Sequence, residues 1–240
     1  MSNDAIRFRR GIWISITFIL LLWTVQAFEV AFSMDLREFG ILPRTLKGTI
    51  GIITGPLIHG DFFHLVSNTF PLIILGVGLF YFYHKIAFEV ILIIYIMTGF
   101  WVWVVARDAY HIGSSGLVYG LLAFLFFSGL LRRDAKTLAV SLVLLFIYGG
   151  NMIYGIFPVN EAISWESHLM GALSGMFCAY FFKNSRSSVD TILEDETSEH
   201  EMVPDEPAPS GQSYTIVWKK EKKIGSSPTY NYDVDKEDLI

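Results

Sequence analysis

The sequence has almost no cysteine and few charged residues. Cys178 is the only cysteine among 240 residues, which excludes an intrachain disulfide and any CxxC or cysteine-rich metal site. Charged residues make up 17% of the chain, compared with about 25% in average soluble domains. The first apolar run is too long for a signal peptide and lacks a small-residue cleavage site. These absences leave the redox compartment open and predict that the first apolar run is retained as a membrane span.

The net negative charge of the chain comes from its C-terminal part. Residues 1–183 hold 12 basic and 10 acidic side chains, whereas residues 184–240 hold 6 and 13. The second part is rich in Ser, Glu, Asp and Pro and has few apolar residues before positions 214–218, a composition typical of disorder. We therefore expect a membrane domain over residues 1–183 and an acidic, mostly disordered cytoplasmic tail over residues 184–240.

Apolar residues are in excess, at 52% of the chain and a mean hydropathy of +0.46. A helix needs about 20 mostly apolar residues to cross the hydrocarbon core of a membrane. The fourth of six candidate segments is short, which suits a helix that begins below the membrane surface, within protein or beside a water-filled cavity. The composition predicts an all-α membrane protein with six transmembrane helices, over about residues 11–28, 65–83, 86–105, 116–131, 138–156 and 165–182.

Basic residues divide the loops into two classes, and Lys and Arg mark the cytoplasmic side of a membrane protein. Nine of them lie just before the first segment, directly after the sixth (Lys183 and Arg186) or in the second and fourth loops, whereas the other loops and their edges hold only four. We therefore predict that both termini are cytoplasmic. The first outward loop, about residues 29–60, is long and apolar, and we expect it to lie in the membrane interface and shield a site.

Three polar groups stand at the outward ends of apolar segments. Ionisable groups are costly inside a bilayer and indicate a functional site there. The predicted topology brings all three groups to the same leaflet at similar depth. They are His59, His64 and Asn68 at the second segment, Gly113-Ser114-Ser115-Gly116 at the fourth, and His168, Gly171 and Gly175 at the sixth.

The serine pair allows two interpretations. A serine before a helix is commonly an N-cap in a flexible turn. A nucleophilic serine needs a base within hydrogen-bond reach and donors for the oxyanion. Here the flanking Gly113 and Gly116 leave room for a substrate backbone, and a helix N-terminus presents free N–H groups to a developing negative charge.

The histidines also have structural alternatives, since polar residues between membrane helices often hydrogen-bond to a neighbouring helix. Gly171 and Gly175 allow a close helix approach, and His168 lies three residues before Gly171 on the same helical face. His64 and Asn68 share a face at i, i+4 spacing. They suit an oxyanion hole, whereas the zinc motif H-E-x-x-H requires a Glu that is missing here.

Together these residues resemble the rhomboid family of intramembrane serine proteases. Its members carry a His, a second His and an Asn leading into the second helix, here His59, His64 and Asn68. They carry Gly-x-Ser-Gly at the head of the fourth helix and a His followed by spaced glycines on the sixth. Tyr119 matches a tyrosine that in the family packs beside the catalytic histidine. The resemblance covers about residues 5–183 and implies the minimal six-helix core that is common in bacteria.

The resemblance implies a Ser-His dyad, with Ser115 as the nucleophile and His168 as the general base. His64, Asn68 and the Ser115 backbone N–H would form the oxyanion hole. His59 would be structural and connect the first loop to the second segment. The Trp-Arg pair found in the first loop of many rhomboids is absent. The residues expected to support the site are His59, Gly113, Gly116, Tyr119, Gly171 and Gly175.

The implied function is hydrolysis of peptide bonds in or near transmembrane segments of single-span or multi-span membrane proteins, with no metal, cofactor or nucleic acid. The implied location is a bacterial inner membrane, with the site toward the outer face. One alternative is a catalytically inactive relative that binds membrane proteins without cutting them. The presence of both Ser115 and His168 argues against it. The other is a small transporter, which predicts inverted repeats or midplane ionisable residues that the sequence does not show.

Overall fold

The computed structural model describes residues 3–158 and 163–185. The chain divides into two units, residues 1–196 and 197–240, and everything below concerns the described residues of the first unit. All but the first two residues of the predicted acidic tail lie outside the described residues. Its boundary at residue 184 and its disorder therefore stay predictions.

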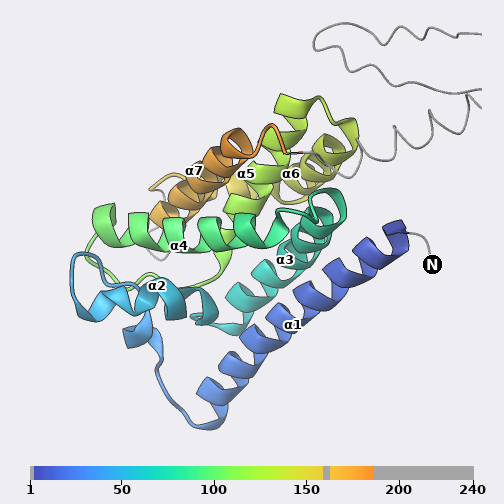
Figure 1. Ribbon diagram of the computed structural model, residues 1–240. Coiled ribbons are helices and arrows are strands. Elements are labelled where there is room, and N and C mark those ends of the chain that lie inside the picture. The colour runs from blue at the N-terminus through green and yellow to red at the C-terminus, as the bar shows by residue number, and fades with distance from the viewer. Residues whose placement is uncertain (1–2, 159–162, 186–240) are drawn as a thin grey trace, which may run out of the picture. The chain divides into compact units, whose positions relative to one another are not determined.

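The described part of the chain is all-helical, with no strand beyond one isolated bridge, which confirms the all-α prediction. Each of the six predicted apolar segments is a helix, and a short additional helix lies in the first outward loop (Figure 1). The α-helices are α1 (Asn3–Ala31), α2 (Gly51–Thr54), α3 (Phe62–Phe82), α4 (Ala87–Val105), α5 (Ser115–Arg132), α6 (Ala135–Gly155) and α7 (Trp165–Phe181).

Among the described residues, four helices, α1, α3, α4 and α5, are long and apolar enough to cross a membrane. The chain is therefore an integral membrane protein by length and composition of its helices. α7 has 17 residues, and the side chains of residues 148–152 in α6 lie outside the described residues. The count of six spans stays a prediction.

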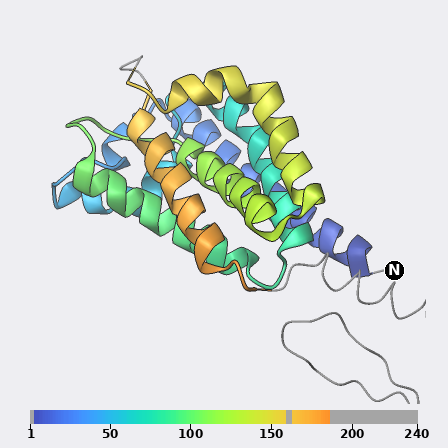
Figure 2. The same cartoon turned by 90° about the horizontal axis from the view of Figure 1, so that it is seen from above.

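α5 is the central helix, because α3, α4, α6 and α7 all pack against it (Figure 2). In its most apolar stretch 67% of the residues are buried, compared with 22% in α1, which packs along α3 at the edge of the bundle. The helix that begins at Ser115 is thus enclosed by protein along most of its length. Such enclosure by protein is what a helix that starts below the membrane surface requires.

Glycines bring α5 and α7 into backbone contact. A Cβ atom on Gly171 would lie 2.1 Å from the carbonyl oxygen of Gly116, and one on Gly175 would lie 2.0 Å from that of Gly120. Small residues four apart on both helices allow this approach. The sequence predicts the close approach at Gly171 and Gly175, and the structure shows that Gly116 and Gly120 on α5 meet them with the same spacing. This contact sets how close residues on the two helices can come.

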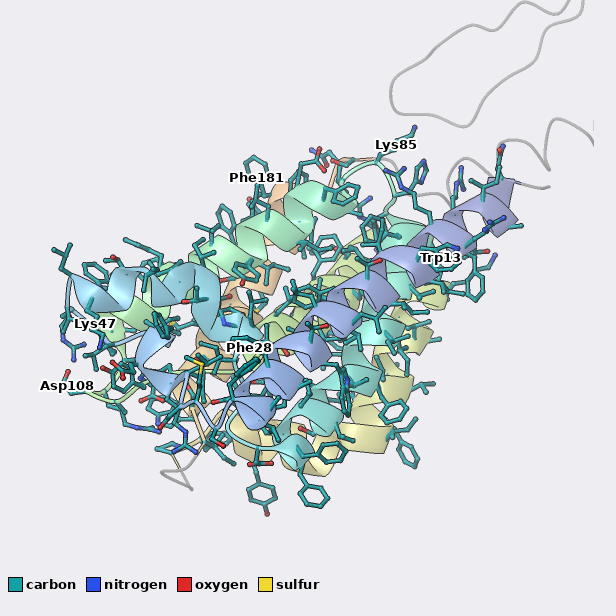
Figure 3. The ribbon with its side chains drawn as sticks, turned by 90° about the horizontal axis from the view of Figure 1, so that it is seen from below. Trp13, Phe28, Lys47, Lys85, Asp108 and Phe181 are labelled. Carbon is teal, nitrogen blue, oxygen red and sulfur yellow. The ribbon has the colours of Figure 1, made fainter. Side chains whose placement is uncertain are left out.

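The first outward loop is folded, with α2 and three 3₁₀ helices, Arg37–Phe39, Lys47–Thr49 and Gly55–Leu57. It packs against the end of α4: the Arg44 side chain donates hydrogen bonds to the carbonyls of Val104 and Ala106 and pairs with Asp108. Ile41 and His111 exchange two backbone hydrogen bonds of 2.9 Å. Figure 3 places Lys47 and Asp108 at the end of the bundle opposite Lys85.

α3 begins three residues earlier than predicted, at Phe62 instead of Leu65. The Asp61 side chain accepts a hydrogen bond of 2.8 Å from the His64 backbone N–H and so caps the helix. An aspartate in this position satisfies one of the free N–H groups of the first turn. The cap places His64 in the first turn of α3, where its backbone is fixed.

Candidate active site

Ser115 and His168 meet where α5 and α7 begin. The Ser115 Oγ atom lies 2.8 Å from the His168 Nε2 atom, and both residues are buried, with 9% and 8% of their surface exposed. Ser115 is the first residue of α5, and His168 lies in the first turn of α7. The glycine contact between the two helices holds these turns together. A hydroxyl and an imidazole nitrogen at this distance form a nucleophile–base geometry.

The contact of His168 with Gly155 shows which ring nitrogen of His168 carries the proton. The His168 Nδ1 atom lies 2.8 Å from the carbonyl oxygen of Gly155, the last residue of α6. A carbonyl oxygen only accepts, so Nδ1 carries the proton and Nε2 presents a lone pair to the Ser115 hydroxyl. The Tyr119 ring stacks on the imidazole at 4.2 Å with 9° between planes. The ring is therefore fixed in position and tautomer by α5 and α6.

The neighbouring serine has a different partner. The Ser114 Oγ atom lies 3.1 Å from His59 Nε2, and the Ser114 backbone N–H donates to the same nitrogen at 3.4 Å. Ser114 is fully buried, as is His59 at 2% exposed. Burial, followed by the nearby His64 ring, lowers the pKa of His59 to about 4. His59 is therefore neutral at pH 7 and ties the segment before α3 to the segment before α5.

His64 lies against the turn that precedes Ser115. Gly113 has φ +103°, and a Cβ atom there would lie 2.6 Å from the His64 Cε1 atom and 2.7 Å from its Nε2 atom. Only glycine adopts this backbone conformation freely and leaves that space. The Asn68 amide, 4% exposed, donates to the His64 carbonyl at 3.1 Å. Because an amide nitrogen has two hydrogens, this bond uses one donor of Asn68.

Glu166 does not contact His168. Its carboxylate binds Arg107 Nη1 through both oxygens, at 3.1 and 3.0 Å, and its side chain is 5% exposed. The His168 Nδ1 atom, where an acid third member of a triad would bind, is occupied by Gly155. The geometry is that of a dyad.

The structure thus brings His59, His64, Ser115, Tyr119 and His168 to one region, with Gly113 beside His64. Gly155 was not predicted from the sequence, because it acts through its backbone carbonyl and every residue type has one. Arg107 and His111, which lie in the segment before Ser115, were also not predicted. Within residues 3–158 and 163–185, no group of three or more His, Cys, Asp or Glu side chains is arranged to hold a metal ion.

Comparison with known proteins shows the family. The model of the rhomboid domain matches residues 47–185, so the chain belongs to the rhomboid family. It is 36% identical over 179 residues to the uncharacterized protein Rv1337 of Mycobacterium tuberculosis, covering 69% of this chain and 72% of the relative. It is 34% identical over 195 residues to the uncharacterized protein ML1171 of Mycobacterium leprae, covering 75% and 74%. The family consists mostly of intramembrane serine proteases.

Proposed function

We propose that this protein is an intramembrane serine protease that uses Ser115 and His168 to hydrolyse peptide bonds in or near transmembrane segments of membrane-anchored proteins. The observation that carries the proposal is the 2.8 Å contact between Ser115 Oγ and the unprotonated Nε2 of His168. Membership of the rhomboid family supports the reaction class. The bond from His168 Nδ1 to Gly155 supports the base role, because it fixes the tautomer that can accept a proton.

The reaction proceeds in two halves. The Ser115 oxygen attacks the substrate carbonyl carbon while its proton moves to His168 Nε2, which gives a tetrahedral intermediate. His168 then returns the proton to the leaving amine as the C–N bond breaks, and an acyl ester on Ser115 remains. Water adds to this ester, again giving a proton to His168, and release of the carboxylic acid restores Ser115.

The oxyanion of the tetrahedral intermediate needs fixed donors. The Ser115 backbone N–H is one of the free N–H groups at the start of α5. We assign the other donors to the His64 ring, which lies against Gly113, and to the second amide hydrogen of Asn68. Buried donors act in a low dielectric and so stabilise the charge more than they would in water.

The membrane arrangement belongs to the same proposal. With α6 and α7 added to α1, α3, α4 and α5, the protein spans the membrane six times, with both termini in the cytoplasm and the site open to the outer face. Mycobacterial relatives support a bacterial inner membrane. Substrates are single-span or multi-span membrane proteins. A helical peptide bond is poorly exposed, so substrates are expected to have helix-destabilising or small residues near the cut.

The test is cleavage of a single-span substrate by the full chain in proteoliposomes. We expect cleavage by the wild type and by Ser114→Ala at reduced or equal rate, and no cleavage by Ser115→Ala or His168→Ala. Matched unfolding temperatures for the four proteins would show that the losses are chemical. Cleavage that survives Ser115→Ala would refute the proposal, and a folded wild type that binds but never cuts its substrates would favour the inactive relative.

A further inference from the structure

A second polar cluster joins the two chain segments that lead into the dyad. One segment, residues 106–114, runs from α4 to Ser115, and the other, residues 163–167, runs into His168. His111 lies four residues before Ser115 and Ser164 lies four residues before His168, and the His111 Nδ1 atom is 2.6 Å from Ser164 Oγ. The contact therefore joins two residues that each lie four positions before a residue of the dyad.

The hydrogen bonds of this cluster have a defined direction. The His111 Nε2 atom lies 3.1 Å from the Arg107 carbonyl oxygen, which can only accept, so Nε2 carries the proton and Nδ1 accepts from Ser164. The Ser164 oxygen in turn lies 2.6 Å from Ser167 Oγ and accepts its proton. Burial lowers the pKa of His111, which favours the neutral ring that this chain of bonds requires.

An ion pair between Arg107 and Glu166 also belongs to the cluster. Arg107 binds both carboxylate oxygens of Glu166 and also donates to the Ile163 carbonyl oxygen at 2.8 Å. Glu166 is 4% exposed, so its charge is compensated inside the protein and not by water. Arg107 Nη1 contacts both carboxylate oxygens, whereas Nη2 donates to the Ile163 carbonyl, so the two ends of the guanidinium hold two different residues. Arg107 thereby fixes residues 163–166 at two points.

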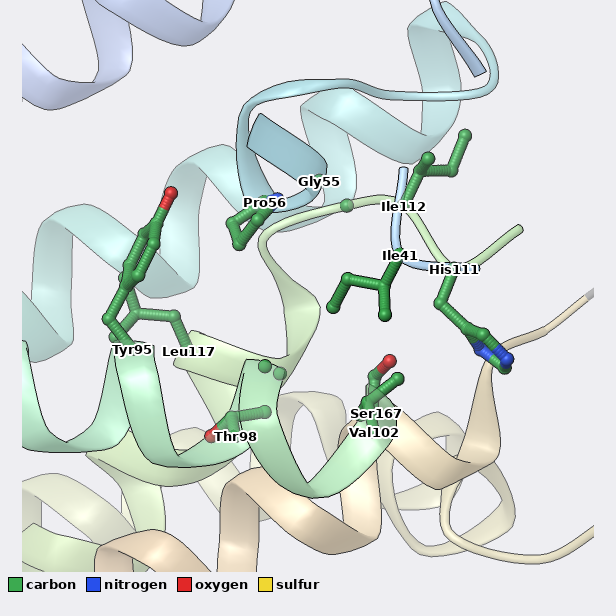
Figure 4. Close-up of a pocket in the computed structure, with 13 residues that line it drawn as sticks. Ile41, Gly55, Pro56, Tyr95, Thr98, Val102, His111, Ile112, Leu117 and Ser167 are labelled. Atoms are coloured by element: carbon green, nitrogen blue, oxygen red, sulfur yellow. The ribbon is translucent and has the colours of Figure 1, made fainter. Parts of the chain in front are cut away.

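The cluster lies directly beside the reacting residues. His111 and Ser167 come from the two different segments and line one small cavity, together with Ile41 and Ile112 (Figure 4). The cavity also reaches Gly113 and Gly116, which flank the serine pair. A Cβ atom on Gly116 would lie 3.1 Å from the Ser167 carbonyl oxygen. Ser167 therefore packs directly against the residue that follows Ser115.

We propose that the Arg107–Glu166 ion pair and the His111–Ser164–Ser167 hydrogen-bond chain form a clamp that positions His168 against Ser115. These five are positioning residues, because none of them touches the reacting atoms. The inference rests on the proposed protease function and names the residues that set its geometry. Misplacement of a catalytic group by about 1 Å costs about 10²-fold in rate, so a partial loosening of the clamp is expected to lower kcat while substrate binding is retained.

The test uses the full chain in proteoliposomes with a single-span substrate. Two variants open the clamp, Glu166→Gln at the ion pair and Ser164→Ala in the hydrogen-bond chain. The matched control is Glu38→Gln, which breaks the exposed ion pair of Glu38 with Lys47 in the first outward loop. Active sites are titrated with a fluorophosphonate, and kcat is expressed per titrated Ser115.

We expect Glu166→Gln and Ser164→Ala to lower kcat per titrated site by about tenfold, part of the loss for a full 1 Å displacement, with KM changed less than about twofold. Ser164→Thr, which keeps the hydroxyl, should recover most of the activity, and Glu38→Gln should match the wild type. If Glu166→Gln gives no titratable protein, the kcat per titrated site of the milder variant Ser164→Ala tests the clamp.

The clamp is refuted if both variants keep the wild-type kcat per titrated site. It is also refuted if the variants have fewer titratable sites but the sites that remain have the wild-type kcat. That second result would mean a purely structural role. Failure of the protease function itself appears differently, as cleavage by Ser115→Ala or no cleavage by any protein in the series. The two proposals therefore fail on different measurements.

Discussion

Replacement of Gly171 by alanine tests whether the contact between α5 and α7 sets the reactive distance. The new Cβ would lie 2.1 Å from the Gly116 carbonyl oxygen, whereas non-bonded heavy atoms settle at about 3.5 Å. The helices must therefore separate locally by about 1 Å. Gly171 is one turn after His168 and Gly116 is next to Ser115, so the separation opens the dyad itself.

A widening of this size moves the Ser115 Oγ to His168 Nε2 distance from 2.8 Å to about 3.8 Å, beyond hydrogen-bond reach. We expect kcat to fall about 10²-fold and stability to fall by about 1–3 kcal/mol, as for other overpacked sites. The assay is substrate cleavage in proteoliposomes per titrated active site, with thermal unfolding in detergent measured in parallel.

The matched control is Gly78→Ala in α3, also a helical glycine inside the bundle. Its Cβ would lie 3.5 Å from Leu125 Cδ1 and 3.8 Å from Val140 Cγ1, which are ordinary contacts. Alanine favours a helix over glycine by about 1 kcal/mol, so this variant should be equally or more stable and fully active. Gly171→Ala with wild-type kcat would contradict the reasoning, as would equal losses in both variants.

Three further predictions concern single groups of the site. Gly155→Ala should lower kcat by at least about tenfold at unchanged KM, because its Cβ would lie 2.2 Å from Tyr119 Oη and 2.9 Å from His168 Nδ1; unchanged kinetics would show that α6 does not support the base. Asn68→Ala should lower kcat about 10²–10³-fold, and an unchanged kcat would remove Asn68 from the oxyanion hole. His59, with its pKa lowered from 6.5 to about 4, takes up its proton more readily when unfolded. It should therefore contribute roughly 3 kcal/mol of stability above pH 6.5 that is lost as the pH falls toward 4. The slope of unfolding free energy against pH should then be shallower in His59→Gln, and an equal slope would contradict this.

The helices of this protein were predictable because their physical cause is local. A run of about 20 apolar residues is enough to specify a membrane helix, and all six predicted segments are helices in the structure. The start of α3 was placed three residues late because the apolar run begins at Leu65, whereas the helix is set by the Asp61 cap. Residues of the first outward loop gave no periodic pattern, so α2 and the 3₁₀ helices were not predicted.

The candidate site was predictable where side-chain identity carries the chemistry. Ser115, His168 and the glycines of α7 are visible in the sequence, and the distances among them required the fold. Gly155 acts through its carbonyl oxygen, which every residue has, so no pattern could identify it. The clamp joins the loop before α5 to Ser164 and Glu166 at the start of α7, over 53 to 59 positions, and contacts of that span do not follow from periodicity.

The central claim is that Ser115 is a nucleophile activated by His168, and covalent labelling tests it most directly. The full chain in detergent is treated with a fluorophosphonate, and the modified residue and its labelling rate are determined by mass spectrometry. We predict one adduct, on Ser115, and a labelling rate at least about 10²-fold lower in folded His168→Ala, within the range for loss of a general base. An adduct on Ser114, or equal labelling rates with and without His168, would contradict the claim.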